Sequence, residues 1–454
     1  MVAAGAAGFL LRGLANPGVA GDGVGYYAPL ASLAFDGDLD LGDELANVSP
    51  QLLRAAFMTP DGRLGDPFPV GPALLWAPGV LLARLLPPQA ALDAPLRKPL
   101  RTLHPGFAPR FARAVLYTSA LEVLLGGALL AAVLAPDVGV LAAAAGPLAA
   151  ALGTPAFFYA LADPSYGHAA TFFSASLLLA LALRDRRRRL PLALLGAAWG
   201  LAALVRWQDV LLGLLLAPRL LDEWRACRGA ARSLVRAALR FGLPALLVFA
   251  PQMLFWWRIY GTPLLRPPGA EFVPFWRPAI APLLLSTWNG AFVWSPLLLV
   301  GFVGLSRLPD RRLLLAAFAA VVIEVYVSAL VLDWWGGRAF GARRLVSLAP
   351  LAALGIAYLL RRFRASPWRL AALAALLVAG CLWSERLAQY NVRGLLPANP
   401  GSAADYVRQY APGSAHAQRY GLWDYPRLVS EAVESERMLR IDARRRAASA
   451  RPHD

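Results

Sequence analysis

Apolar residues dominate long stretches of the chain, without the two-residue alternation of a half-buried strand. Many stretches are about 17 or more residues long, which is enough to cross a hydrocarbon core as a helix. Only helices and closed barrels satisfy every backbone group inside a bilayer. The pattern therefore predicts an all-α polytopic membrane protein with about 10–12 transmembrane helices. The stretches lie near residues 1–15, 68–86, 111–134, 139–162, 167–183, 190–217, 241–257, 281–305, 313–332, 343–360 and 368–384.

Short arginine-rich loops separate several of these stretches and predict their sidedness. By the positive-inside rule we expect these loops on the cytoplasmic side. The outer side then receives residues 258–278 and 333–344 and the tail after 385. The stretch 190–217 must leave and return to the cytoplasmic side, which predicts two short helices that meet at "RWQD" (206–209), with Arg206 at the outer surface. The basic loops are 184–189, 219–240, 307–312 and 361–369.

The topology between residues 68 and 162 leaves two alternatives. Three apolar stretches lie there, yet an even number of crossings must separate 21–67 from 163–168 if both are external. We expect the proline- and glycine-interrupted stretch 139–162 not to cross cleanly. In the alternative, the loop around Arg97, Lys98 and Arg101 is external despite its charge.

Composition agrees with a membrane protein and excludes several function classes. The chain of 454 residues is 58% hydrophobic and 16% charged, with a mean hydropathy of +0.50. Its net charge of +17 comes mainly from arginines in short loops, where they face anionic lipid. No basic helix or aromatic-studded sheet accompanies this charge, so nucleic-acid binding is not expected. Cys227 and Cys381 do not indicate a disulfide framework or a zinc site. No Walker or Rossmann pattern is present, which fits a lipid-phosphate donor and a transporter equally.

We expect two parts in the chain. Residues 1–384 form the transmembrane module, with external loops at about 16–67 and about 258–280. Residues 385–454 form a short, polar, extracytoplasmic tail, in which "RLVSEAVESERMLRIDARRRAAS" has a weakly amphipathic helical pattern. The expected location is the plasma or inner membrane, and membrane lipid is the expected surrounding partner.

Six carboxylates gather in "GDGVGYYAPLASLAFDGDLDLGDE" (21–44), in a chain that is otherwise strongly apolar. Most of them are typical of a solvated turn with helix caps. Asp22 differs, because it stands at the end of the first helix and is followed by Tyr26 and Tyr27. A carboxylate at the membrane interface can act as a general base toward an acceptor hydroxyl or help bind a metal, and the residues alone leave both roles open.

Further candidates lie near the predicted outer ends of helices. His168, beside Tyr166, can coordinate a metal or contact a phosphate, although such a histidine can also be simply hydrogen-bonded. Arg206 is flanked by apolar residues and is a functional candidate because charge is costly in a bilayer, or it lies at an ordinary helix turn. Glu324 is expected to pair with an arginine of a neighbouring helix. The remaining arginines suit a lipid-linked phosphate or serve as interface anchors, and they are Arg258, Arg338, Arg343 and Arg344.

Several segments resemble a known superfamily. "GDGVGYYAPLASLAFDGDLDL" followed by "FPVGPALLWAPGVLLARLL" resembles the beginning of GT-C membrane glycosyltransferases, which include protein O-mannosyltransferases and lipid A aminoarabinose transferases. Later segments resemble GT-C segments in the same order, over roughly residues 15–350. They are "YALADPSYGHAATFFSASLLLALALRDRRRR", "GLAALVRWQDVLLGLLLAP", "FWWRIYGTP" and "WWGGRAFGARRL".

The resemblance implies a GT-C-like fold that transfers a sugar from a polyprenyl-phosphate carrier to an acceptor glycan, lipid or protein. It implies Asp22 as the base or a metal-linked carboxylate, and Asp163 or His168 as the match to the second external loop. The family's acidic pair is here Asp22–Gly23, so Asp163 or Glu44 must supply the second carboxylate, and Glu44 is the candidate ligand of a divalent metal cation. The candidate substrate-binding residues are Tyr26, Tyr27, His168, Arg206, Arg258, Arg338 and Arg343. The alternatives are a transporter or lipid flippase, and a non-catalytic relative of GT-C transferases.

Overall fold

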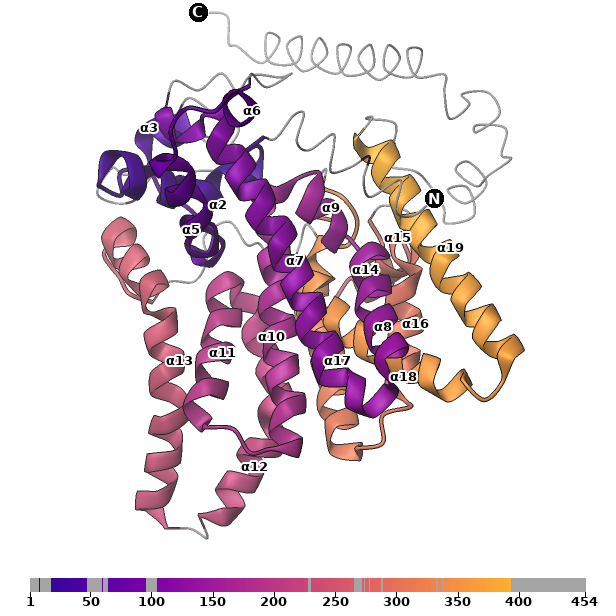
Figure 1. The fold of residues 1–454 in the computed structure, drawn as a ribbon. Coiled ribbons are helices and arrows are strands. Elements are labelled where there is room, and N and C mark those ends of the chain that lie inside the picture. The colour runs from indigo at the N-terminus through magenta and orange to yellow at the C-terminus, as the bar shows by residue number, and fades with distance from the viewer. Residues whose placement is uncertain are drawn as a thin grey trace, which may run out of the picture.

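The computed structural model describes residues 18–46, 64–94, 104–227, 230–264, 278–286, 289–331 and 339–392, with a few isolated positions between these ranges (Figure 1). Within them, the named elements are all helical, and an isolated bridge joins Phe272 and Val331. The predicted all-α class is therefore confirmed. The tail segment predicted to form an amphipathic helix lies outside the described residues.

The chain forms a succession of helices of very different lengths. In chain order they are α2 (Asp22–Ala31), the π-helical η1 (Ser32–Asp36), α3 (Gly42–Ala46), α5 (Gly71–Leu85), α6 (Ala90–Asp93), η2 (Pro105–Phe107), α7 (Pro109–Val138), α8 (Val140–Leu152), α9 (Ala156–Leu161), η3 (Pro164–Tyr166), α10 (His168–Arg187), α11 (Leu192–Val205), η4 (Trp207–Leu216), α12 (Ala217–Ala226), α13 (Ala231–Tyr260), α14 (Ile280–Leu285), α15 (Ala291–Trp294), α16 (Pro296–Leu305), α17 (Arg311–Leu330), η5 (Arg343–Leu348), α18 (Ala349–Phe363) and α19 (Pro367–Val392).

Five helical segments are long and apolar enough to cross a membrane. They are Pro109–Val138, Ala231–Tyr260, Arg311–Leu330, Arg343–Phe363 and Pro367–Val392. Leucines on the outer surface of α7 and α13, such as Leu124 and Leu247, are more than 60% exposed. Lipid is the solvent that suits such a surface. The predicted polytopic membrane protein agrees with this arrangement.

The basic loops gather at one end of the bundle. Arg186 pairs with Asp310 at 2.6 Å, and Arg312 pairs with Asp222 at 2.9 Å, so loops far apart in sequence meet there. Figure 1 shows α12 and the connection from α18 to α19 at this same end, opposite α2 and α3. These loops therefore lie at the same end of the bundle, as the charge pattern predicts. We call the opposite end the α2–α3 end.

Helix α5 does not cross the bundle, although its sequence is as apolar as that of a membrane span. Its first residue, Gly71, packs directly on the backbone of Leu204 and Val205 at the α2–α3 end. At its last turn, the Arg110 guanidinium donates hydrogen bonds to the carbonyls of Ala83 and Leu86. Arg110 begins α7 at the same end (Figure 1). Both ends of α5 thus lie at the α2–α3 end.

The stretch 139–162, which was expected not to cross cleanly, forms two helices rather than one. Helices α8 and α9 together return the chain to the α2–α3 end and bend at Gly153–Pro155, because proline cannot continue the helical hydrogen bonding. The segment between α5 and α7 begins and ends at the α2–α3 end, as the alternative required. Arg97, Lys98 and Arg101 themselves lie outside the described residues.

Three other predicted stretches can be compared with the helices. The stretch 190–217 forms the expected pair of arms, α11 and η4, with an extended Arg206 between them and Gly213 packed against the Trp199 ring. The stretch 281–305 is divided into α14, α15 and α16, because Asn289 adopts a left-handed conformation and a proline follows Ser295. The predicted module boundary after 384 falls inside α19, which ends at Val392.

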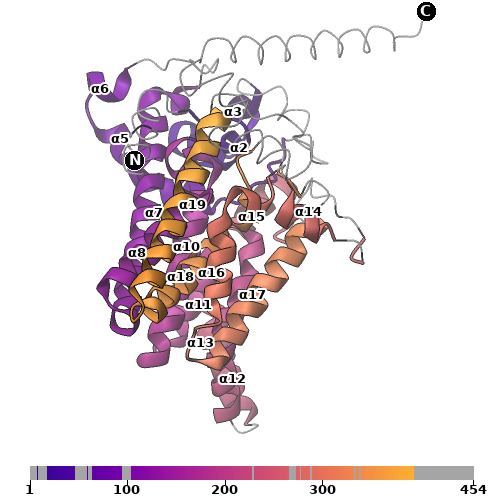
Figure 2. The ribbon, with the colours of Figure 1, turned by 90° about the vertical axis from the view of Figure 1, so that its right-hand side faces the viewer.

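Glycines allow α16 and α18 to pack backbone against backbone (Figure 2). A Cβ atom at Gly355 would overlap the Gly301 carbonyl oxygen, and one at Gly304 would overlap the backbone of Gly355. Small residues at a helix crossing permit this close approach in membrane proteins. This contact fixes the position of α18, whose preceding turn η5 carries Arg343 and Arg344.

Replacing Gly355 by leucine is therefore expected to lower the free energy of unfolding by about 3 kcal/mol, at the upper end of typical overpacking costs. The matched control is Gly242→Leu on α13, where a Cβ atom has no neighbour within 4 Å. Thermal unfolding in detergent, followed by tryptophan fluorescence, measures both variants. Equal midpoints for the two variants would contradict the proposed crossing.

Candidate active site

The candidate site is built around an ion pair between the beginning of α2 and the beginning of η5. Asp22 lies in the first turn of α2, where the helix dipole favours a carboxylate. The Arg343 Nη1 atom lies 2.6 Å from Asp22 Oδ2, although the two residues are 321 positions apart in sequence. Gly21 precedes Asp22 with a φ of +57°, and a Cβ atom there would strike the Tyr166 hydroxyl. This close approach places Asp22 beside the turn that carries Asp163.

Asp163 is the second carboxylate near Arg343. It directly precedes η3, and Ser165 in that turn packs against Gly23 of α2. Burial raises the pKa of Asp163 to about 6, and the positive charge of Arg343 opposes this rise. The Arg343 guanidinium also lies over the Tyr166 ring, 5.5 Å from its centroid. The structure therefore brings together Asp22, Asp163 and Arg343, all of which were candidates from sequence.

Two side chains hold the segment that leads into η5. The Tyr159 hydroxyl donates to the Phe340 carbonyl at 3.1 Å and accepts from the Phe340 N–H at 3.0 Å. The Asn289 Oδ1 atom accepts from the Gly341 N–H at 3.1 Å, and its Nδ2 donates to the Trp335 carbonyl at 2.8 Å. These bonds fix the backbone just before Arg343.

Histidine and tyrosine side chains line the same region. The buried His168 ring lies 4.5 Å from the Tyr159 ring, and neither of its nitrogens has a hydrogen-bond partner among the described residues. Tyr26 packs against the Phe68 ring at 4.7 Å. His168 and Tyr26 both lie within electrostatic reach of Arg206 and Arg343. A polar ligand at this place would meet hydroxyl, imidazole and guanidinium groups together.

Arg206 lies between α11 and η4, where the two short helices were predicted to meet, and its side chain is buried. Its Nη1 donates to the Arg344 carbonyl at 2.5 Å, and its Nη2 donates to Gln208 Oε1 at 2.6 Å. These bonds offset the cost of burying the charge.

Glu324, on α17, lies close to Arg206 and to Asp209. The Ser347 hydroxyl donates to its Oε1 atom at 3.5 Å. Arg206 is thus an arginine within electrostatic reach of Glu324, although its two hydrogen bonds given above go to Arg344 and Gln208.

The structure does not bring every sequence candidate to the site. Tyr27 is fully buried in the core, where its hydroxyl donates to the Gly106 carbonyl at 2.8 Å. Arg258, near the end of α13, is exposed and contributes to the lining of an apolar cavity. Arg338 lies outside the described residues. Glu44 belongs to a separate cluster and does not supply the second carboxylate beside Asp22.

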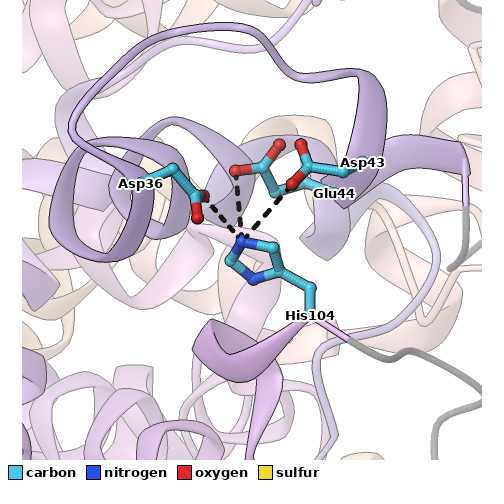
Figure 3. A group of neighbouring side chains, drawn as sticks. All are labelled: Asp36, Asp43, Glu44 and His104. Atoms are coloured by element: carbon cyan, nitrogen blue, oxygen red, sulfur yellow. Dashed lines mark hydrogen bonds and ion pairs between the residues drawn. The ribbon is translucent and has the colours of Figure 1, made fainter.

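Glu44 lies with Asp36, Asp43 and His104 at the far end of α2 (Figure 3). Burial and the neighbouring Asp43 carboxyl raise the pKa of Glu44 to about 9. His104 was missed by sequence reasoning, because a single histidine in "TLHPGF", far from the acidic segment, has no motif around it.

Asp38 and Asp40 have the turn roles expected from sequence. The Asp38 Oδ1 atom accepts hydrogen bonds from Ser32 Oγ and the Asp40 N–H, and Asp40 Oδ1 accepts from the Gly42 N–H. These contacts are typical of Asx turns before a short helix.

An apolar cavity of about 670 Å³ lies beside the far half of α2. Its lining comes from α2, α5 and α13 and includes Leu30, Leu33, Leu74, Phe255 and Arg258. The cavity begins about 10 Å from Asp22 along α2, at 1.5 Å per helical residue. Its size and lining suit an isoprenoid or acyl chain.

No protein-family model and no curated protein matches the sequence. Two solved structures are similar to the chain. ArnT from Cupriavidus metallidurans bound to undecaprenyl phosphate is 19% identical, with 95% of this chain and 74% of that chain covered and a TM-score of 0.46. ArnT from Cupriavidus metallidurans in the apo state is 16% identical, with 90% and 67% covered and a TM-score of 0.49.

Proposed function

We propose that this protein is a GT-C-like membrane glycosyltransferase that moves a sugar from a polyprenyl-phosphate donor to an acceptor hydroxyl. The observation that carries the proposal is the meeting of Asp22, Asp163 and Arg343 at the α2–α3 end. Two carboxylates and a guanidinium, held on three separate segments, provide the groups that sugar transfer from a phosphate requires. The sequence resemblance supports the same reaction class.

In the proposed reaction, each of the three charged side chains has one role. The Asp22 carboxylate accepts the proton of the acceptor hydroxyl, and the acceptor oxygen attacks the anomeric carbon of the sugar. The bond between that carbon and the phosphate oxygen breaks, and polyprenyl phosphate leaves with the bonding electrons. Arg343 stabilises the negative charge that develops on this phosphate. Asp163 acts in its ionised form as the second carboxylate beside the reacting sugar.

The cavity beside α2 is the proposed site of the carrier chain. A polyprenyl phosphate is apolar along its length and charged at one end. This matches an apolar cavity that begins about 10 Å along α2 from Asp22, the partner of the Arg343 guanidinium. Arg258 in the cavity lining suits contact with a lipid-linked phosphate. We propose that the α2–α3 end faces away from the cytoplasm, since the basic loops gather at the other end.

A transporter is the second candidate, and one observation favours it. Asp209 and Glu324 are fully buried near Arg206, and ionisable groups inside a membrane bundle often mark a transport pathway. The transferase hypothesis accounts for the side chains around Arg343. The transporter hypothesis accounts only for the buried Asp209 and Glu324 near Arg206. An assay of sugar transfer separates the two, because a transporter leaves the donor intact.

Asp22→Asn is expected to lower the transfer rate by at least about 100-fold, because asparagine cannot accept the acceptor proton. The assay mixes purified protein with polyprenyl-phosphate sugars and acceptors extracted from the membranes of the source cells. Mass spectrometry measures the polyprenyl phosphate released.

The matched control is Asp40→Asn, which changes an exposed carboxylate of the same segment whose role is a local turn. It is expected to retain the wild-type rate. Equal release by wild type and Asp22→Asn would remove Asp22 as the base. No release by wild type with a complete extract would favour the transporter.

The rate should also depend on pH through Asp163. Because the pKa of this carboxyl is raised to about 6, it is mostly protonated at lower pH and mostly ionised above. The transfer rate should therefore fall about tenfold between its plateau and a pH one unit below that value. Rates measured between about pH 4.5 and 8 test this, with Asp163→Asn as the comparison. An unchanged inflection in Asp163→Asn would assign the titration to another group.

A further inference from the structure

Three segments converge on one group of side chains at the end of α2 that is remote from Asp22 (Figure 3). Asp36 ends η1, Asp43 and Glu44 belong to α3, and His104 directly precedes η2. The His104 Nε2 atom lies 2.7 Å from Asp36 Oδ2, 3.7 Å from Glu44 Oε1 and 3.8 Å from Asp43 Oδ2. One ligand atom from each residue lies within 4.8 Å of all the others. The group is about 20 Å from Asp22 at 1.5 Å per helical residue.

The burial of Glu44 is the observation that points to a bound cation. Its side chain is completely buried, and its polar neighbours include the Asp43 carboxyl and, at 3.7 Å, the His104 Nε2 atom, which leave the two carboxylate oxygens incompletely satisfied. A buried carboxylate beside other carboxylates is costly, so such groups normally pair with a cation or keep a proton.

The tautomer of His104 decides which kind of cation fits. Its Nδ1 atom accepts a hydrogen bond from the Gly106 N–H at 3.1 Å, so Nδ1 carries no proton. In the neutral ring the proton is then on Nε2, which donates to Asp36. A metal on Nε2 would require the proton on Nδ1, where it would oppose the Gly106 N–H. His104 therefore orients Asp36 as a hydrogen-bond donor, and the available ligands are carboxylate oxygens.

We propose that Asp36, Asp43 and Glu44 bind one oxygen-preferring divalent cation of the Ca²⁺ class, with His104 as a positioning donor to Asp36. Ca²⁺ takes oxygen ligands at about 2.3–2.6 Å, so ligands on opposite sides of the ion are about 5 Å apart, which matches the size of this group. Carbonyl oxygens or water would complete the coordination. The cation joins the end of α2 to α3 and to the turn before α7.

The proposal does not rest on the transferase function, because the site is remote from Asp22 and its role is to hold α2 in place. Its tests therefore need no transfer activity. The measurements are the cation content after dialysis, by elemental mass spectrometry, and the unfolding midpoint in detergent with Ca²⁺, Mg²⁺, Zn²⁺ or EDTA.

Wild-type protein is expected to retain about one Ca²⁺ per chain and to unfold about 3 °C or more higher in a hundredfold excess of Ca²⁺ over the Kd than in EDTA. Glu44→Gln is expected to lose the bound ion and this shift. In EDTA the same variant should be at least as stable as wild type, because a neutral amide replaces a buried carboxyl. Asp40→Asn, an exposed carboxylate outside the group, is the control and should keep both the ion and the shift.

His104→Gln separates the donor role from a ligand role, since glutamine keeps an N–H donor but has no ring nitrogen. Ca²⁺ affinity within about threefold of wild type supports the proposal, whereas loss of the ion makes His104 a ligand and overturns the assignment. Selective retention of Zn²⁺ over Ca²⁺ would likewise overturn it, because zinc favours nitrogen ligands. If wild type holds no cation and shows no shift, Asp43 and Glu44 are a proton-sharing pair and the site does not exist.

Discussion

The ion pair between Asp22 and Arg343 is the interaction on which the rest of the site depends. It connects the first described helix to a turn 321 residues later, and at 2.6 Å it joins two elements that share no sequence neighbourhood. Arg343 can reach Asp22 because η5 precedes α18, and α18 is fixed by backbone contact with α16 at Gly301 and Gly355. The crossing of α16 and α18 thus determines the position of the Arg343 guanidinium at the α2–α3 end.

Other polar and aromatic side chains surround the Asp22–Arg343 ion pair. Asp163, Tyr166 and His168 come from the η3–α10 connection, and Tyr159 and Asn289 hold the backbone that carries Arg343. Opposite charges that stabilise each other in the resting protein are also the groups that a phosphate and an acceptor hydroxyl require. In the proposed reaction, the donor phosphate takes over part of the Arg343 contact and leaves the Asp22 carboxylate available to accept a proton.

The sequence was sufficient for the fold class, and it predicted that the candidate site residues lie opposite the basic loops. Long apolar stretches and arginine-rich loops predict both, because hydrocarbon and anionic lipid act on each segment independently. It could not show that α5 lies along the end of the bundle, since apolar residues suit packing on α2 and α7 as well as lipid. Asp22 was identifiable from its motif, but Arg343 was one of several equivalent arginines until tertiary contacts paired it. His104 and the burial of Glu44 depend on segments that meet only in three dimensions.

The most direct test of the account is mass spectrometry of the lipids that co-purify with wild type and with Asp22→Asn. A variant that binds the donor but cannot activate the acceptor should retain the bound donor. We expect a polyprenyl-phosphate sugar bound to Asp22→Asn in clear excess over wild type, and absent from Arg343→Ala, which lacks the phosphate contact. Bulk phospholipid alone on all three proteins would contradict a lipid-linked sugar as the donor.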